Sequence, residues 1–426
     1  MMRIVLFFLL AVLLLSGCGV SKSSFSPDKK YSPDQIQKDF SVYQTILEQS
    51  HPGLYWYTTK DSMDHYFNAA KEQLKDSMTE PQFRKLLNYV TAKIDCGHTS
   101  VRSSKKFSKY LDTARSKIFP LSMKLWSGKI NPDDDTMVVA TNLNRRDSML
   151  TRGTIIKKIN DKSAHEIIDT LFNYISTDGY NTTHKYQSLS NRGFFGSLYT
   201  SVFGPMDKYK IEYIDSFGRI KQTIIPVFNP AMDTSFRAAI RPLLSMPHPS
   251  KKERRQMQLS SIRQLKIDSA NHTAFMDLGS FGRGYHLKSF FRHSFRALRK
   301  HHIDHFIIDV RSNGGGSVSN STILSRYLSD HRFKIADSLY AIRKKSTYGR
   351  YIQNDFFNRL FMTLLTRNKK DGHYHFGYFE RHYFNPKKNN HYSGKVYVLI
   401  GGNSFSATTL FTSSVLKQEN VLVVGE

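Results

Sequence analysis

The chain has 426 residues, which is too long for one ordinary hydrophobic core and predicts two or three domains. Hydrophobic residues make up 39% of the chain and aromatic residues 13%, so a disordered protein is excluded. Lysine and arginine number 62 against 35 acidic residues, giving a formal net charge of +27. Such a charge fits anionic lipid headgroups or acidic substrates. Nucleic acid is the other usual partner, but the sequence carries no nucleic-acid-binding motif, and the spread of its basic residues favours a solvated basic surface.

The N-terminus, MMRIVLFFLLAVLLLSGCGV, has the form of an export signal. Arg3 supplies a positive charge, and 12 apolar residues follow from Ile4 to Leu15, a run short for a membrane span and typical of a signal-peptide core. The ending Leu-Ser-Gly-Cys resembles a bacterial lipobox, in which Cys18 would carry lipid. An ordinary signal peptide that happens to hold a cysteine is the alternative. We therefore expect a lipoprotein signal peptide over residues 1–18, a polar tether over 19–31, and a membrane-anchored protein in the periplasm or on the cell surface.

The chain has 2 cysteines. If Cys18 carries lipid, Cys96 has no cysteine partner and no intramolecular disulfide can form. The fold must then depend on its hydrophobic cores, although the protein is exported.

Residues 32–110 predict a small helical domain. The Ser-Pro-Asp sequence that begins at Ser32 is typical of a helix start, and the His-Pro-Gly sequence at His51 is typical of its end. A second helix fits residues 62–75. The Thr-Glu-Pro-Gln sequence at Thr79 has the capping-box pattern and predicts a third helix, which runs up to Asp-Cys-Gly-His.

Residues 115–228 predict a β-rich domain, because short apolar runs alternate with turns. Within it, LTRGTIIKKINDKSAHEIIDTL (150–171) predicts a strand, a turn and a helix. This order resembles the core of a PDZ domain, and PDZ domains bind extended peptide ends by adding a strand to their sheet. Any small β-domain with a helix is the alternative. The basic, polar residues 231–265 that follow predict a linker or a surface helix.

From residue 272 the pattern is α/β, and a strand followed by a glycine-rich turn and a helix occurs twice. The expected elements are a strand over 272–278, a helix over 287–300, a strand over 305–310, a helix over 319–329 and a strand over 395–400. The strand over 305–310 is almost continuously apolar, as parallel strands buried on both faces are. Residues 332–393, rich in aromatic and basic side chains, form an insertion whose role the sequence leaves open. We find no zinc-ligand spacing, dinucleotide fingerprint or phosphate loop, so we expect neither a metal nor a cofactor.

Three short stretches could carry chemistry. In GGNSFSATTLF (401–411) a serine at a strand-to-helix turn can act as a nucleophile, although serine at a helix start is usually a cap. Glycines 314–316 can present backbone N–H groups to an oxyanion, or can form a turn that needs positive φ. His98 could be the base, but it is one of 17 histidines and by default would be structural.

IIDVRSNGGG, GKVYVLIGGNSFSATTLF, KIDCGHTS and the PDZ-like stretch together resemble the C-terminal-processing peptidases. That family includes the tail-specific serine proteases and the tricorn core protease. The resemblance covers most of residues 32–426. It implies a multidomain α/β protein with a crotonase-like (ClpP/crotonase) catalytic core over 229–426 and a PDZ-like domain inserted before it, over 115–228.

By this resemblance Ser406 is the nucleophile and Ser404 a turn or cap residue. The N–H groups of Ala407 and of Gly314 or Gly315 would hold the oxyanion. One branch of the family takes its base from a lysine well past the serine, a position beyond the end of this chain, and Lys417 is too near the serine to be that residue.

The tricorn-like branch uses a histidine from an earlier domain, which His98 matches. It has a serine where this chain has Gly97, and its histidine is oriented by an acid past the nucleophile, for which Glu426 is a weak candidate. Family members continue beyond the Val-Gly-Glu of residues 424–426, so we expect a truncated C-terminus.

The sequence thus predicts a lipid-anchored serine endopeptidase that cleaves exported polypeptides through an acyl-enzyme. The PDZ-like domain would gather extended peptide or a free C-terminus. A catalytically inactive peptide-binding lipoprotein with the same fold is one alternative, and a basic surface-adhesion protein is another. Substrate preference, oligomeric state and the role of the insertion as lid, partner site or surface excursion stay open.

Overall fold

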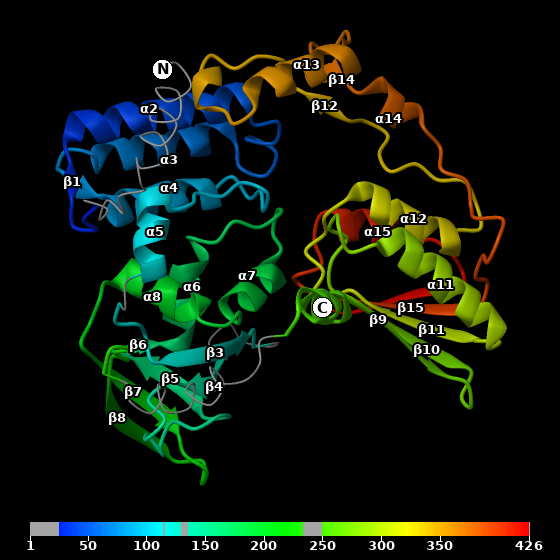
Figure 1. Ribbon diagram of the computed structural model, residues 1–426. Coiled ribbons are helices and arrows are strands. Elements are labelled where there is room, and N and C mark those ends of the chain that lie inside the picture. Colours follow the sequence, from blue (N-terminus) through cyan, green and yellow to red (C-terminus); the bar gives the residue numbers. More distant parts are fainter. Residues whose placement is uncertain (1–24, 114–115, 129–134, 233–248, 426) are drawn as a thin grey trace, which may run out of the picture.

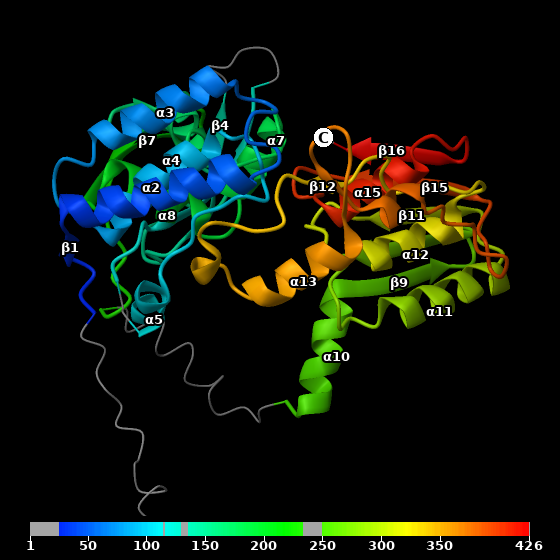
Figure 2. The ribbon, with the colours of Figure 1, turned by 90° about the horizontal axis from the view of Figure 1, so that it is seen from above.

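The computed structural model describes residues 25–113, 116–128, 135–232 and 249–425 (Figure 1). The chain forms two parts that lie side by side in both views (Figures 1 and 2). One part holds the helices and the antiparallel sheet of residues 30–226, and the other holds the α/β unit of residues 251–425. The predicted signal peptide, Cys18 and Glu426 lie outside the described residues. In the described ranges, every helix is too short or too polar to cross a bilayer.

The N-terminal helices begin where their caps predict. Ser32 and Thr79 each form the capping box that the sequence indicates, with glutamine as the reciprocal partner. The first helix ends at Ser50, as predicted, and the second begins at Lys60, two residues earlier than predicted. The elements are α2 (Pro33–Ser50), α3 (Lys60–Glu72), α4 (Glu80–Ala92), α5 (Lys105–Thr113) and the short antiparallel pair β1 (Lys30–Tyr31) and β2 (Met78–Thr79).

An antiparallel sheet follows, in the order β3-β4-β5-β7-β8, with β6 paired to β5. The predicted strands and the strand, turn and helix of residues 150–171 are present. Two further helices were not predicted, because a sequence such as FFGSLYTSVF favours strand by propensity; packing of Phe195 and Tyr199 into the core outweighs that preference. The elements are β3 (Leu121–Trp126), β4 (Thr136–Asn142), β5 (Ile155–Ile159), β6 (Lys162–Ser163), α6 (Ala164–Phe172), α7 (Thr182–Leu189), α8 (Phe194–Phe203), β7 (Lys208–Ile214) and β8 (Ile220–Pro226).

The second part is the predicted α/β unit, built on a sheet of order β16-β15-β11-β10-β9. All its neighbouring strands are parallel except β9, which is antiparallel to β10. The expectation of a linker or helix over 231–265 is wrong from Arg263 onward, where alternating half-buried residues such as Leu265 and Ile267 form the edge strand β9. The elements are α10 (Lys251–Ile262), β9 (Arg263–Asp268), β10 (Thr273–Leu278), α11 (Leu287–Lys300), β11 (His305–Asp309), α12 (Val318–Leu328), β15 (Lys395–Ile400), α15 (Ala407–Val415) and β16 (Val421–Gly425).

Helices α11, α12 and α15 cover one face of this sheet (Figures 1 and 2). In β11, Phe306 and Ile308 face these helices and are fully buried, whereas Ile307 points to the other face and is half-buried. The expected burial of β11 on both faces is therefore wrong for the described part of the chain, where the helices lie on one side.

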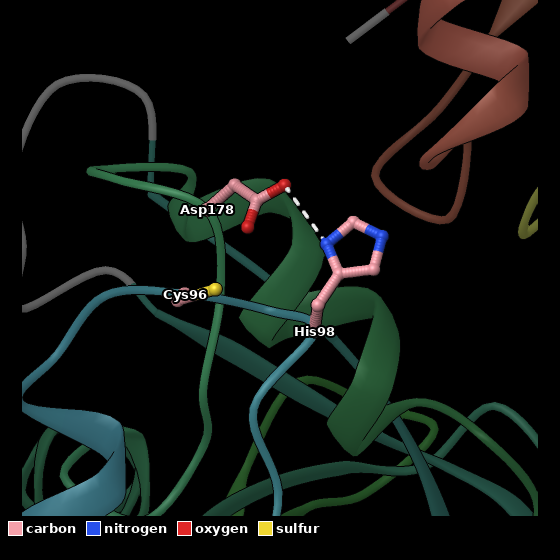
Figure 3. A group of neighbouring side chains, drawn as sticks. All are labelled: Cys96, His98 and Asp178. Atoms are coloured by element: carbon pink, nitrogen blue, oxygen red, sulfur yellow. Dashed lines mark ion pairs between the residues drawn. The ribbon is translucent and has the colours of Figure 1, made fainter. Parts of the chain in front are cut away.

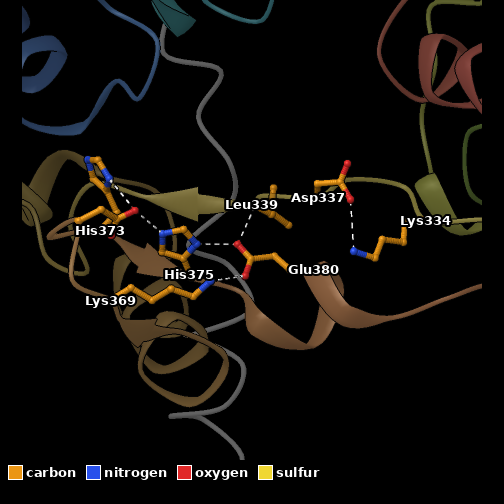
Figure 4. Close-up of polar contacts among 8 residues, drawn as sticks. Lys334, Asp337, Leu339, Lys369, His373, His375 and Glu380 are labelled. Atoms are coloured by element: carbon orange, nitrogen blue, oxygen red, sulfur yellow. Dashed lines mark hydrogen bonds and ion pairs between the residues drawn. The ribbon is translucent and has the colours of Figure 1, made fainter.

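The insertion between α12 and β15 has a small sheet of order β12-β14-β13. Its polar centre is His375, whose ring nitrogens lie 2.6 Å from Glu380 Oε1 and 2.7 Å from Asp371 Oδ2 (Figure 4). Thr347 Oγ1 donates to Gln49 Oε1 of α2 at 2.9 Å, so the insertion also contacts the N-terminal helices. Its elements are β12 (Tyr340–Ala341), η2 (Gly349–Tyr351), α13 (Asp355–Leu365), β13 (Arg367–Asn368), β14 (Tyr374–His375) and α14 (Gly377–Arg381).

Candidate active site

The two glycine-rich turns meet at one edge of the parallel sheet. Strands β11 and β15 are neighbours in register, and Asp309 lies opposite Leu399 where both strands end. Val310 N–H donates to Leu399 O at 2.9 Å, and Ser404 Oγ donates to Val310 O at 2.7 Å. The carboxyl edge of a parallel sheet is where α/β proteins place their ligands, so this edge is the first place to look for a site.

Asn313 fixes the two turns to each other. The residue is fully buried, and its amide donates to Leu278 O and accepts from Gly315 N–H, both at 2.9 Å. Its backbone oxygen accepts from Phe405 N–H at 3.1 Å and from Thr408 Oγ1 at 2.9 Å. One asparagine therefore ties the end of β10, the turn after β11 and the turn after β15.

The two serines of the second turn have different conformations and roles. Ser406 has φ 57° and ψ −118°, immediately before α15, and its side chain makes no capping hydrogen bond. Residues with a Cβ rarely occupy this region, at a cost of roughly 1–3 kcal/mol, and such strain clusters at functional sites. Ser404 instead bonds Val310 O and accepts from Gly401 N–H at 3.2 Å, as a turn residue does.

The glycines of the first turn approach Ser406 closely. A Cβ on Gly315, where φ is +95°, would lie 2.6 Å from Phe405 O and 2.9 Å from Ala407 N. A Cβ on Gly314 would meet nothing within 4 Å. Because Gly315 donates its N–H to Asn313, Gly314 is the better oxyanion donor of the two. Ala407 is the first residue of α15, so its N–H has no acceptor within the helix.

His98 comes to this edge from the other part of the chain. Its ring lies against Phe405, with centroids 4.4 Å apart, and 57% of its side chain is exposed. Asp178, in the loop between α6 and α7, accepts from Gly97 N–H at 2.7 Å and places Oδ2 4.0 Å from His98 Nδ1 (Figure 3). Neither Asp178 nor Phe405 was singled out from the sequence, where nothing marks residues so far apart as neighbours.

Gly97 leaves room for this contact. A Cβ on Gly97 would lie 2.9 Å from Phe405 Cζ. Phe405 thus occupies the space that a side chain at position 97 would need, which gives a physical reason for glycine where the tricorn-like pattern has serine.

Residues 272–426, which include both glycine-rich turns and Ser406, match the model of peptidase family S41. The α/β unit of the chain is thus similar to the peptidases of family S41. This similarity supports a serine-type peptidase of the C-terminal-processing kind.

Solved structures resemble this chain in fold. Mature CPAF is 13% identical, with 92% of this chain and 83% of that chain covered and a TM-score of 0.58. A serine-to-alanine mutant of CPAF is 12% identical, with 92% and 83% covered and a TM-score of 0.60. At these identities the likeness shows the fold alone. No curated protein sequence matches the chain.

Helix α7 also holds the turn that carries Ser406. His184 Nδ1 donates to Gly402 O at 2.8 Å, and Gln187 Oε1 accepts from Asn403 N–H at 3.1 Å. The His184 ring stacks on Phe405 with centroids 6.0 Å apart. The antiparallel-sheet part of the chain therefore supports the turn at several points besides His98.

A charged pair fixes the start of the first turn. Arg311 donates to both carboxylate oxygens of Asp309, from Nε at 3.0 Å and from Nη2 at 2.6 Å. Hydrogen bonding to Arg311 lowers the pKa of Asp309, while burial and the charge of Asp309 raise the pKa of Asp277 on the adjacent strand. Asp309 therefore stays ionised and holds Arg311 at the edge where the site lies.

Proposed function

We propose that the protein is a lipid-anchored serine endopeptidase in which Ser406 is the nucleophile and His98 the general base. The observation that carries this proposal is the strained backbone of Ser406, at the N-terminus of α15 and against the turn of Gly314 and Gly315. The contact of His98 with Phe405, the residue before Ser406, adds a base at the same place.

The chemistry follows from these positions. Ser406 Oγ attacks the scissile carbonyl carbon while its proton passes to His98 Nε2, and the N–H groups of Ala407 and Gly314 hold the oxyanion. The C–N bond then breaks, and the leaving amine takes the proton from His98. Water, deprotonated by His98, hydrolyses the acyl-enzyme and restores Ser406.

Asp178 is the residue that supports His98 in this proposal. Its Oδ2 faces Nδ1, and a hydrogen bond between them would keep the proton on Nδ1 and leave Nε2 free to accept one. The distance of 4.0 Å is longer than a hydrogen bond, and such contacts often shorten when substrate binds. Asp178 is thus a positioning residue and does not itself touch substrate.

The antiparallel sheet would gather polypeptide at its edge strand β8. Ile220 and Ile224 lie on one face of this strand and are 63% and 66% exposed. An edge strand with exposed apolar side chains can pair with an extended segment, which is how PDZ-like domains bind peptides. This supports a protease that first captures an extended polypeptide or a free C-terminus.

The lipid anchor is proposed from the sequence Leu-Ser-Gly-Cys, with lipid on Cys18. The net charge of +27 would strengthen contact with anionic headgroups in the periplasm or at the cell surface. Cys18→Ser should move the protein from the membrane fraction to the soluble fraction, and retention in the membrane fraction would contradict the anchor.

Labelling by a fluorophosphonate tests the catalytic assignment. Wild type should be labelled, and mass spectrometry should place the adduct on Ser406. Ser406→Ala should abolish labelling and lower kcat for peptide hydrolysis by at least about 10⁴-fold. His98→Ala should slow labelling by about 100-fold or more, because the serine loses its base.

Ser404→Ala is the matched control. It removes the hydrogen bond to Val310 O, which should cost about 1 kcal/mol of stability, but it should keep labelling. Labelling that survives in Ser406→Ala, or that is lost only in Ser404→Ala, would overturn the assignment.

A further inference from the structure

Three potential metal ligands meet beside the proposed base. Cys96, His98 and Asp178 each offer one ligand atom, and these atoms all lie within 4.8 Å of one another (Figure 3). Thiolate, imidazole and carboxylate are the three side-chain ligands that Zn²⁺ takes in proteins. Asp178 Oδ1 is occupied by Gly97 N–H, so Oδ2, which faces His98, is the oxygen available to a metal.

The three ligand atoms lie somewhat farther apart than in a formed zinc site. With Zn–S near 2.3 Å and Zn–N near 2.0 Å, ligand atoms of a tetrahedral site lie about 3.3 to 3.6 Å apart. His98 Nδ1 and Asp178 Oδ2 are 4.0 Å apart, and both side chains lie on loops. The three ligand atoms lie up to 4.8 Å apart, so the side chains must rotate to bring them about 0.7 to 1.3 Å closer together. His98 and Asp178 are 57% and 48% exposed, so an ion can enter and water can fill the fourth position.

We propose that Cys96, His98 and Asp178 form an inhibitory site for a divalent transition-metal ion, Zn²⁺ above all. The inhibitory role rests on the proposed function, since it requires His98 to be the base.

Binding would stop catalysis through the two nitrogens of one ring. The thiol of Cys96 releases its proton to solvent and binds as thiolate, Asp178 binds through Oδ2, and His98 binds through the lone pair of Nδ1. A neutral imidazole has one lone pair and one N–H, so an ion on Nδ1 leaves the proton on Nε2. Nε2 can then no longer accept the proton of Ser406. The thiolate and the carboxylate also cancel the charge of the ion.

The sequence did not indicate this site. Because it shows no zinc-ligand spacing, we expected no metal. Cys96 and His98 are separated by a single residue, and the third ligand comes from the loop before α7. The fold, rather than the spacing, brings Asp178 to the pair.

Titration with Co²⁺ tests the site directly, because a cobalt–thiolate bond gives a charge-transfer absorption in the near ultraviolet. The full chain should show this band, and Zn²⁺ should displace it. Cys96→Ser should abolish the band, and Asp178→Asn should weaken Zn²⁺ binding at least about 10-fold. His65→Ala is the matched control, since His65 lies on α3 outside the cluster, and it should bind the ion as wild type does.

Peptide hydrolysis and fluorophosphonate labelling, each measured with and without Zn²⁺, test the inhibitory role. Zn²⁺ should suppress both in wild type, EDTA should restore both, and Cys96→Ser should need at least about 10-fold more Zn²⁺ for the same suppression.

A cobalt spectrum without a thiolate band, or one unchanged in Cys96→Ser, would overturn the site. Full hydrolysis with the site saturated would overturn the inhibitory role. Absence of Ser406 labelling without metal would contradict the proposed function, and the cobalt titration would still decide whether the metal site exists.

Discussion

The imidazole of His98 lies on the ring of Phe405, with centroids 4.4 Å apart and planes tilted by 32°. His98 belongs to the loop after α4, and Phe405 directly precedes Ser406 in the turn after β15. An aromatic contact between two distant segments therefore joins the proposed base to the proposed nucleophile. Sites work best when such supporting contacts hold their groups rigidly.

We predict that Gly97 and Phe405 are energetically coupled. Gly97→Ala places a methyl group 2.9 Å from Phe405 Cζ, so the ring and the imidazole against it must shift. Misplacement of a catalytic group by about 1 Å can lower kcat about 100-fold, so a decrease of about 10- to 100-fold is expected. In a Phe405→Leu background the same substitution should cost much less. Independent effects of the two substitutions on kcat, measured by a double-mutant cycle, would contradict the coupling.

The two glycines beside Ser406 should differ sharply in their tolerance of alanine. A Cβ at position 315 would meet Phe405 O, and the alanine would have to keep the backbone φ of +95°. Gly315→Ala should therefore destabilise the protein by more than about 1 kcal/mol and lower kcat strongly. The added Cβ of Gly314→Ala would meet nothing within 4 Å, and the backbone N–H is kept. The unfolding temperature of this variant should therefore equal that of wild type. Thermal unfolding and steady-state kinetics of both variants decide this, and equal effects would count against the described turn.

Asn313 should be essential for stability as well as activity. Asn313→Ala leaves the buried Leu278 C=O and Gly315 N–H without their partner, which should lower the free energy of unfolding by about 2–4 kcal/mol. Urea denaturation measures this value. Asn403→Ala is a matched control, because the contact of Asn403 with Gln187 uses its backbone N–H. A loss as small as that of the control would show that Asn313 does not bind the turns together.

Much of the fold could be predicted because its causes are local. The capping boxes at Ser32 and Thr79 are four-residue motifs that mark the starts of their helices. Helix α11 begins and ends where its apolar pattern does. The helix of residues 194–203 was missed because its aromatic residues favour strand, and only packing on the sheet decides the outcome.

The site was predictable only in part. The assignment of Ser406 as nucleophile and His98 as base is a prediction from a family resemblance, not from local pattern. Asp178 lies 81 residues after Gly97, to which it is hydrogen-bonded, and no periodicity links the two loops. The positive φ of Ser406 and the contact of the Phe405 ring with His98 are likewise consequences of tertiary structure.

A substitution in the edge strand β8 should weaken the binding of long substrates more than that of short ones. Ile224→Glu puts a charge on the exposed face of this edge, which should hinder pairing with an apolar extended segment. We expect KM for an unfolded polypeptide to rise about 10-fold, because loss of one apolar binding contact has an effect of that size. KM for a short peptide should change little. An equal change for both substrates would place the effect at the catalytic site instead.

The insertion should be most stable between about pH 4.5 and 6.5. Hydrogen bonds to Glu380 and Asp371 raise the pKa of His375 above 6.5. Its stabilising contribution is therefore complete below pH 6.5 and is lost as the pH rises through the raised value.

The two carboxylates act in the opposite direction. Burial alone would raise the pKa of Glu380, but Lys369, the Leu339 N–H and His375 together lower it from 4.5 to about 2. The His373 N–H and His375 lower the pKa of Asp371 from 3.8 to about 2. Both contributions are present above those ordinary values and are lost as the pH falls toward 2.

Denaturant unfolding of wild type and His375→Gln, measured from about pH 2 to pH 8, tests these opposite contributions of His375 and the two carboxylates (Figure 4). The difference between the two midpoints should be largest between pH 4.5 and 6.5, where His375 is charged and both carboxylates are ionised, and should shrink on either side. His65→Gln, on the exposed surface of α3, should show no such profile. A difference that grows as the pH rises above 6.5 would mean that His375 stabilises the insertion as the neutral imidazole, which the two carboxylates around it argue against.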